Sequence, residues 1–110
     1  MKKDPKIFLL HILESIEAIE KYVKKMNKKD FIIKPLVQDA VIRRLIVIGE
    51  AAKNVPSDYK RQNPHIRWRD VGDMRNKIIH EYFGIDLNLV WEVVNKDIRE
   101  LKKEVLGLLK

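Results

Sequence analysis

The chain has 110 residues, of which 45% are hydrophobic and 35% charged, which fits one small folded domain over residues 1–110 and argues against disorder. No cysteine is present, which excludes a disulfide framework, thiolate chemistry and cysteine-based metal sites. The net charge of +7 suits a polyanionic partner such as RNA, DNA or an acidic protein, although lysine-rich helices also carry such charge as solvated faces. The charged start lacks a signal-peptide pattern, and apolar runs such as Ile7–Leu10 are too short to span a bilayer. We therefore expect a cytoplasmic protein with no membrane association.

Two long helices are predicted in the first half of the chain from apolar spacing and proline positions. Asp4 is expected to cap a helix that has Pro5 in its first turn and continues to about residue 26. The stretch Asp30–Lys34 is ambiguous and fits a short turn of helix. After Pro35, a second long helix is expected to run to about Asn54.

The second half is predicted to hold one short helix, Ser57–Gln62, and two longer ones. The first of the two longer helices runs from about Trp68 to about Tyr82, with Gly84 just beyond as a stop signal. Asp86 is expected to cap the last helix, whose apolar seam is spaced by three and four residues: Leu87, Val90, Val94, Ile98, Leu101, Val105 and Leu108. No segment shows sustained strand alternation with hairpin turns. The predicted fold is all-α, a small up-and-down helical bundle.

The last helix carries apolar residues beyond the seam: Leu89, Trp91, Val93, Leu106 and Leu109. A homodimer formed through helices would cover this surplus. The alternative is that these are scattered exposed apolar residues, which are normal on a monomer.

The side chains best suited to catalysis lie in the segment Arg75–Tyr82, which has an Arg-x4-His-x-Tyr pattern. Arginine holds phosphate through paired hydrogen bonds, and histidine exchanges protons near neutral pH. This suits metal-independent phosphodiester cleavage: His80 takes a proton from a ribose 2′-hydroxyl or protonates the leaving oxygen, and Arg75 stabilises the developing charge. Asn76 is a supporting residue that orients His80 or a phosphate oxygen. Chemistry through the 2′-hydroxyl selects RNA over DNA.

On an ideal helix these side chains do not converge. Arg75 falls in an apolar sector beside Tyr82, so it lines a cleft, extends past the apolar stripe, or pairs with a carboxylate such as Glu50. Arg75 and His80 are separated by about 140°, whereas Asn76 and His80 share a side. Three explanations stay open: Arg75 curls round the helix, the helix ends or distorts near His80, or a second subunit supplies the complementary pair.

Metal and nucleotide-hydrolysis alternatives have little support. Only three histidines exist, and neither a His-Glu-x-x-His motif nor an acidic cluster accompanies His80. His11 and His65 are expected to be structural or solvent-exposed. No glycine-rich phosphate loop is present, which excludes a nucleotide-hydrolysing P-loop. No metal and no cofactor is expected. Trp68 and Trp91 are interpreted as packing anchors, with base stacking by Trp68 or Tyr82 as the alternative.

The sequence contains pairs of adjacent lysines, among them Lys24-Lys25, Lys28-Lys29 and Lys102-Lys103. Such pairs are usually solvated faces. The alternative is that they guide RNA as a diffuse positive field.

Over nearly its whole length, the chain resembles the HepT-like toxins of the HEPN superfamily. The resemblance is carried by Leu10-His11-Ile12, residues 38–45, Ile48-Gly49-Glu50-Ala51-Ala52, Trp68, Met74-Arg75-Asn76, His80-Glu81-Tyr82, Asp86, Val90-Trp91 and Asp97. The Arg-x4-His-x-Tyr motif shows no departure from the family pattern.

The resemblance implies an all-α domain that dimerises and places its motif at the dimer cleft. It implies a metal-independent ribonuclease, the toxin of a type VII-like toxin–antitoxin pair, in which Arg75 and His80 are catalytic. It further implies that a cognate nucleotidyltransferase antitoxin adds AMP to Tyr82 and blocks the site. Two other hypotheses stay open: a non-catalytic helical dimer that binds RNA or nucleotide or docks a partner, and a structural role for Arg75 and His80 in a buried polar network.

Overall fold

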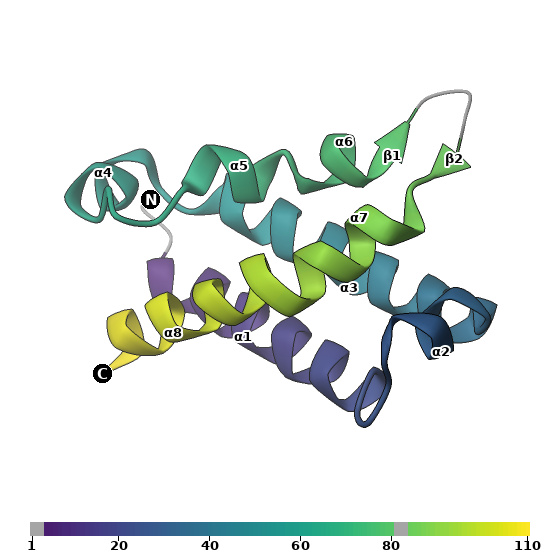
Figure 1. The fold of residues 1–110 in the computed structure, drawn as a ribbon. Coiled ribbons are helices and arrows are strands. Elements are labelled where there is room, and N and C mark those ends of the chain that lie inside the picture. The colour runs from purple at the N-terminus through teal and green to yellow at the C-terminus, as the bar shows by residue number, and fades with distance from the viewer. Residues whose placement is uncertain (1–3, 81–83) are drawn as a thin grey trace.

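The computed structural model describes residues 4–80 and 84–110, which form a helical bundle (Figure 1). The elements are α1 (Pro5–Tyr22), α2 (Lys28–Ile32), α3 (Pro35–Asn54), α4 (Ser57–Gln62), α5 (Trp68–Gly72), α6 (Met74–Ile78), β1 (Ile79–His80), β2 (Gly84–Ile85), α7 (Leu87–Glu92), η2 (Val93–Asp97) and α8 (Ile98–Leu109). The all-α prediction is confirmed, with one two-residue ladder added. No helix of the described part of the chain is long and apolar enough to cross a membrane.

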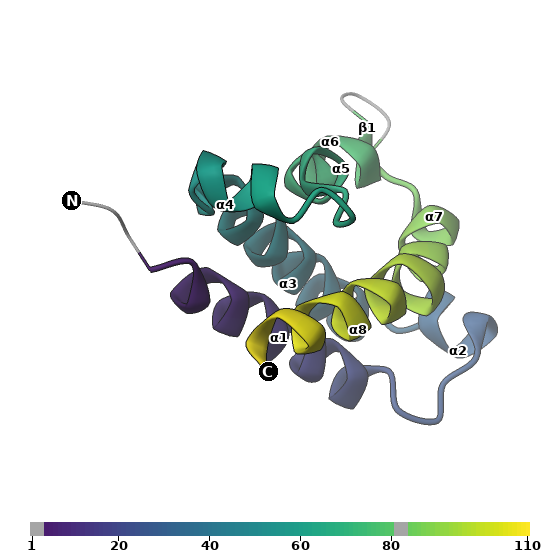
Figure 2. The same ribbon diagram turned by 90° about the vertical axis from the view of Figure 1, so that its left-hand side faces the viewer.

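The long helices α1 and α3 pack against each other at the centre, and α8 packs on α1 (Figures 1 and 2). Their apolar stripes meet in a single buried cluster, which includes Leu9, Ile12, Ile16 and Ile19 of α1, Val41, Leu45 and Ile48 of α3, and Ile98, Leu101 and Val105 of α8. The spacing that predicted these helices is therefore the spacing of the core. The segment from α5 to α6 lies along α3 and so rests on the central pair.

Capping side chains set the ends of the first helices. Asp4 caps α1, as predicted, by accepting a 2.9 Å hydrogen bond from a backbone N–H of the first turn. The helix ends at Tyr22, earlier than predicted: Val23 leaves helical geometry with φ −100° and ψ 9°, and Lys25 then adopts a left-handed φ of 63°. Asn27 and Asp30 then form a capping box that starts α2 at Lys28. The short helical turn considered for Asp30–Lys34 therefore exists, but it begins two residues earlier and ends at Ile32.

The predicted helix Trp68–Tyr82 is wrong, because the segment divides into two short helices and a strand. Asp73 separates α5 from α6 with φ −88° and ψ 10°, and α6 ends at Ile78. Ile79 is extended (φ −104°, ψ 116°). Adjacent β-branched residues favour this change, since branched side chains are restricted in helices and fit strands well.

A short antiparallel hairpin follows α6. Ile79 pairs with Ile85, and His80 pairs with Gly84. Gly84 has a φ of 77°, a left-handed conformation that glycine adopts without strain. Asp86 then caps α7 by accepting from the backbone N–H of Leu89 at 3.1 Å, as predicted.

Most of the apolar residues outside the seam of the last helical run are covered by packing within the chain. A π-helical turn, η2, interrupts this run, and the extra residue in such a turn rotates the faces that follow. Val93 is buried, and Trp91 packs against Phe31 of α2 with ring centroids 5.2 Å apart. Leu89 and Leu109 are partly buried against the core, and Leu106 remains 41% exposed. The apolar surplus is therefore mostly covered within one chain and does not by itself require a homodimer.

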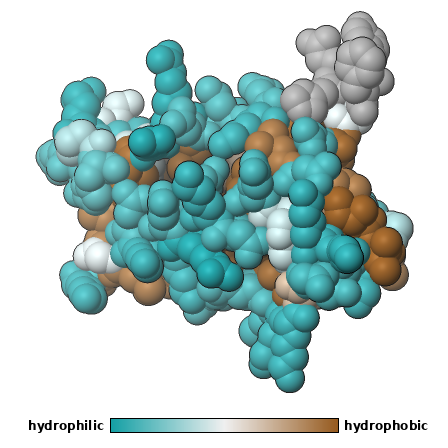
Figure 3. Space-filling model, viewed as in Figure 1, coloured by the Kyte–Doolittle hydropathy of each residue, from teal (hydrophilic) through white to brown (hydrophobic). Residues whose placement is uncertain are grey.

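Exposed apolar side chains gather instead around α2 and the start of α3. Ile32, Ile33 and Leu36 are exposed, the last by 85%. Figure 3 shows a hydrophobic area at this end of the molecule, on a face that is mostly hydrophilic.

Candidate active site

The motif segment is seated on α3 by a close backbone approach at Gly49. A Cβ added there would lie 3.1 Å from the carbonyl oxygen of Val71 and 3.4 Å from that of Gly72. The end of α5 therefore packs directly on the backbone of α3, which only glycine allows without displacement. Met74 and Ile78 then bury one face of α6 in the core. This packing turns the intervening residues outward.

Arg75 and Asn76 lie on that outward face and are exposed. Neither side chain makes a hydrogen bond or ion pair with another residue in the described ranges 4–80 and 84–110. The prediction that Arg75 sits in an apolar sector is wrong, because the sector assumed one continuous helix through Asp73. The exposure of Arg75 also argues against a buried polar network around this residue. An exposed guanidinium without a partner is free to bind a phosphate.

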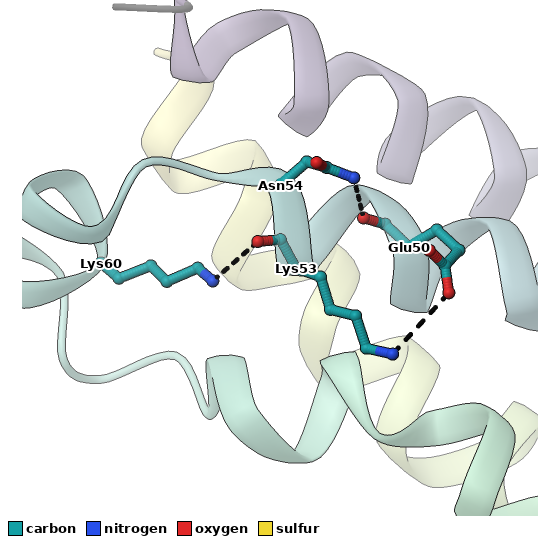
Figure 4. Close-up of polar contacts among 4 residues, drawn as sticks. All are labelled: Glu50, Lys53, Asn54 and Lys60. Atoms are coloured by element: carbon teal, nitrogen blue, oxygen red, sulfur yellow. Dashed lines mark hydrogen bonds and ion pairs between the residues drawn. The ribbon is translucent and has the colours of Figure 1, made fainter.

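Glu50, the carboxylate considered as a partner for Arg75, is engaged within its own helix (Figure 4). Its Oε1 lies 3.7 Å from Lys53 Nζ, and both side chains are about half exposed. The amide of Asn54 donates to the carbonyl of Glu50 at 2.8 Å, and Lys60 Nζ donates to that of Lys53 at 3.3 Å. These contacts join residues at the end of α3 to one another and to Lys60. Glu50 therefore does not pair with Arg75.

His80 follows α6 in β1, opposite Gly84. The backbone changes from helical at Ile78 to extended at Ile79, so the angular separation calculated for an ideal helix does not apply to His80. Of the three explanations for the five-residue spacing, the structure supports a helix that ends before the histidine. Tyr82 lies outside the described residues.

Comparison with known proteins gives a match to the ribonuclease HepT-like family over residues 12–107. The chain belongs to this family. It is 46% identical to "Probable ribonuclease HepT" of Thermococcus cleftensis, over 93% of each chain. It is 38% identical to a "Putative RNase" of Caldanaerobacter subterraneus, over 97% of this chain and 96% of the relative.

A third relative is longer. The chain is 51% identical over 99% of its length to "Gamma-glutamylcyclotransferase and putative RNase" of Methanocaldococcus jannaschii, but spans only 49% of that protein. No solved structure gives a significant match.

In this HepT-like chain the motif helix is tethered to the last helical run by a surface ion pair. Lys77 Nζ of α6 lies 3.0 Å from Asp97 Oδ2 of η2, and the side chains are 47% and 41% exposed. A pair this exposed contributes at most about 1 kcal/mol to stability. Its value is geometric, since it connects α6 to the π-helical turn. Local sequence patterns do not reveal this role of Asp97, because its partner lies twenty residues away along the chain.

The tether crosses a groove of about 690 Å³ between α5–α6 and η2–α8. Its lining includes four residues with positive side chains, Arg67, Lys77, Lys96 and Lys103, and four with carboxylates, Asp70, Asp97, Glu100 and Glu104. Arg75 is not among the lining residues. The balanced charge gives this groove no preference for a polyanion.

The predictions for the two tryptophans as packing anchors and for His11 and His65 as structural or exposed residues are confirmed. Trp68 is buried, donates from Nε1 to the carbonyl of Asn63 at 2.9 Å, and anchors the start of α5. Trp91 anchors α7 against α2. His11 and His65 are exposed. Within the described residues, no three His, Asp or Glu side chains gather where they would hold a metal ion.

Proposed function

We propose that this HepT-like chain is a metal-independent ribonuclease of the cytoplasm, active as a homodimer, in which Arg75 and His80 cleave RNA. The observation that carries the proposal is the exposed guanidinium of Arg75, free of described partners, just before the helix-to-strand change that leads to His80. Family membership and relatives named as ribonucleases support RNA as the substrate.

The chemistry assigns each residue one task. His80 removes the proton of a ribose 2′-hydroxyl, and the 2′-oxygen attacks the neighbouring phosphorus. The 5′-oxygen leaves and is protonated by a second group, which the His80 of a second subunit would supply. Arg75 stabilises the negative charge that grows on the phosphate oxygens, and Asn76 holds the phosphate or the imidazole in position. The products are a 2′,3′-cyclic phosphate and a free 5′-hydroxyl.

We further propose that the chain is the toxin of a toxin–antitoxin pair and that Tyr82 is its point of control. A cognate nucleotidyltransferase antitoxin would transfer AMP from ATP to the tyrosine oxygen and release pyrophosphate. The added phosphate, only seven residues from Arg75, would occupy the guanidinium and obstruct RNA.

Cleavage of RNA in the presence of a chelator tests the enzymatic proposal. The wild type is expected to produce 2′,3′-cyclic ends, and Arg75→Ala and His80→Ala are each expected to lower the rate by about 10²-fold or more. Equal cleavage by all three proteins would mean a contaminating nuclease. Retention of RNA without cleavage by the wild type would favour the non-catalytic dimer instead.

Intact mass after co-expression with the neighbouring nucleotidyltransferase tests the control proposal. The wild type is expected to gain mass in AMP multiples and to lose cleavage activity. Tyr82→Phe is the matched control, since it keeps the ring and removes the acceptor oxygen. An unchanged wild-type mass, or an equal gain in Tyr82→Phe, would contradict the assignment.

A further inference from the structure

A second groove, here called the basic groove, lies between the end of α1 and the η2–α8 run, which are neighbours in Figure 2. It encloses about 540 Å³, within the range of about 300–1,000 Å³ that is usual for ligand sites. Its lining contains no described residue of α5, α6 or β1, so it is distinct from the Arg75–His80 site.

The charge of the basic groove is strongly one-sided. Five of its lining side chains are positive: Lys24, Lys25, Arg99, Lys102 and Lys103. Glu20 is the single acidic residue among the described lining, and its carboxylate already accepts a hydrogen bond from Lys102 Nζ at 2.8 Å. Four positive side chains therefore remain without an acidic partner among the described residues.

The lining between these cations is apolar and partly aromatic. Val23, Met26 and Trp91 are half-buried, above the fully buried Ile19 and Ile98. The contact of Trp91 with Phe31 holds the indole in place. A fixed aromatic surface beside a row of cations is the combination that binds single-stranded nucleic acid, because bases stack on the ring while phosphates meet the cations.

The backbone around the groove also departs from regular structure. Lys25 adopts a left-handed φ of 63°, which is unfavourable for a residue with a Cβ, three residues after the end of α1. The opposite wall contains the π-helical turn η2, and such turns are frequent at functional sites. The unusual backbone on both walls therefore coincides with the row of positive charge.

We propose that the basic groove binds a segment of single-stranded RNA as a second contact site, remote from the Arg75–His80 site. The lysines and Arg99 engage phosphates, and Trp91 with Met26 supplies the apolar surface for a base. The inference rests on the proposed function, because it takes RNA as the substrate. The groove beside Lys77 has balanced charge and does not offer such a site.

The experiment measures binding separately from cleavage. A fluorescent single-stranded oligonucleotide with 2′-O-methyl riboses keeps bases and phosphates but lacks the hydroxyl that the cleavage chemistry needs. Its affinity is measured by anisotropy over a range of salt concentrations for the wild type and two double variants. K24E/K25E reverses two cations of the groove, and K28E/K29E reverses an adjacent lysine pair that is exposed and outside the lining. The two variants have the same net charge.

Counterion release predicts the size of the effect. Loss of two phosphate contacts lowers the salt slope of binding by about 1.4, and the affinity at 0.1 M salt by about ten- to thirtyfold. K24E/K25E is expected to show this loss, and K28E/K29E is expected to bind close to wild type. Equal losses in both variants would mean a diffuse field and would overturn the proposal, as would no loss in either.

The variant Lys25→Gly distinguishes a loss of RNA binding from a loss of folding. Glycine accepts the left-handed conformation, so this variant is expected to melt no lower than wild type while its affinity falls several-fold. Wild-type affinity in Lys25→Gly would count against the groove. Poly-glutamate is the second probe: binding as tight as that of the oligonucleotide would show that the groove selects only negative charge, and RNA would no longer be its assigned occupant.

Trp91 provides a local readout. In a Trp68→Phe background, binding of the oligonucleotide is expected to quench the remaining indole emission, and an unchanged emission would remove Trp91 from the site. The two proposals fail separately. A wild type that binds RNA in the groove but cleaves none refutes the ribonuclease, whereas cleavage with unaltered binding by K24E/K25E refutes the groove.

Discussion

Replacement of Gly49 by alanine tests whether the close approach of α5 to α3 positions the motif segment. Two opposing effects decide the outcome. Alanine favours the interior of α3 by about 1 kcal/mol relative to glycine. The new Cβ lies 3.1 Å from the carbonyl oxygen of Val71, so this backbone must move by a few tenths of an ångström. Overpacking of this kind typically costs about 1–3 kcal/mol.

The net expectation for Gly49→Ala is therefore a loss of about 1 kcal/mol in the free energy of unfolding, or about 4–8 °C in Tm for a domain of this size. Gly107→Ala is the matched control, since Gly107 also lies in a helix but an added Cβ would meet nothing within 4 Å. It is expected to gain up to about 1 kcal/mol. The difference between the two variants, about 2 kcal/mol, isolates the contact with Val71.

Urea denaturation followed by circular dichroism measures both values, and RNA cleavage well below the melting range measures the consequence for the site. A displacement of α5 moves α6 and Arg75 with it, so Gly49→Ala is expected to cleave RNA more slowly than Gly107→Ala. If Gly49→Ala is stabilised as much as Gly107→Ala and cleaves equally well, the close approach does not position the motif.

The remaining predictions concern the motif and its supports. Arg75→Ala is expected to change stability by less than about 0.5 kcal/mol, because the side chain is exposed and free of described partners, and a sharp fall in Tm would restore the buried-network hypothesis. Mixing inactive Arg75→Ala with inactive His80→Ala is expected to recover no cleavage activity, because the mixed dimer keeps only one of the two His80 side chains that the proposed mechanism uses as base and acid; recovered activity would show that one His80 is enough. Asp97→Asn is expected to lower the free energy of unfolding by at most about 1 kcal/mol, yet to slow cleavage because the ion pair with Lys77 is weakened. Lys77→Met is expected to have the same effect, and unaltered cleavage in both variants would show that the ion pair does not matter for the site. Asp86→Ala is expected to cost about 1 kcal/mol through the lost cap of α7, measured by thermal unfolding, and no change would show that water replaces the cap.

Much of the framework was predictable because it depends on local chemistry. Pro35 and Asn54 bound a helix whose apolar spacing alone defined the buried side, and the observed α3 has the predicted ends. Asp4 and Asp86 cap the helices where a carboxylate precedes the first turn, as predicted. These features need only neighbours within four residues, so a single sequence contains the information.

The motif segment was harder to predict because local pattern and tertiary packing disagree there. Apolar spacing from Trp68 onwards is compatible with one helix, but Gly49 admits the end of α5 so closely that the chain turns at Asp73. The pairing of Ile79 with Ile85 then favours a strand over a further helical turn. Both interactions involve residues that are distant in sequence or lie beyond the segment, so periodicity cannot reveal them.

The sequence by itself determined the chemical identity of the motif, Arg75 with His80 five residues on, together with the helical class of the fold. Tertiary structure alone decided that Arg75 is exposed and that the helix stops before His80. It also gathered Lys24 and Lys25 with Arg99 around Trp91. The physical reason is that residue type is a property of position in the chain, whereas exposure and charge clustering depend on which distant elements pack together.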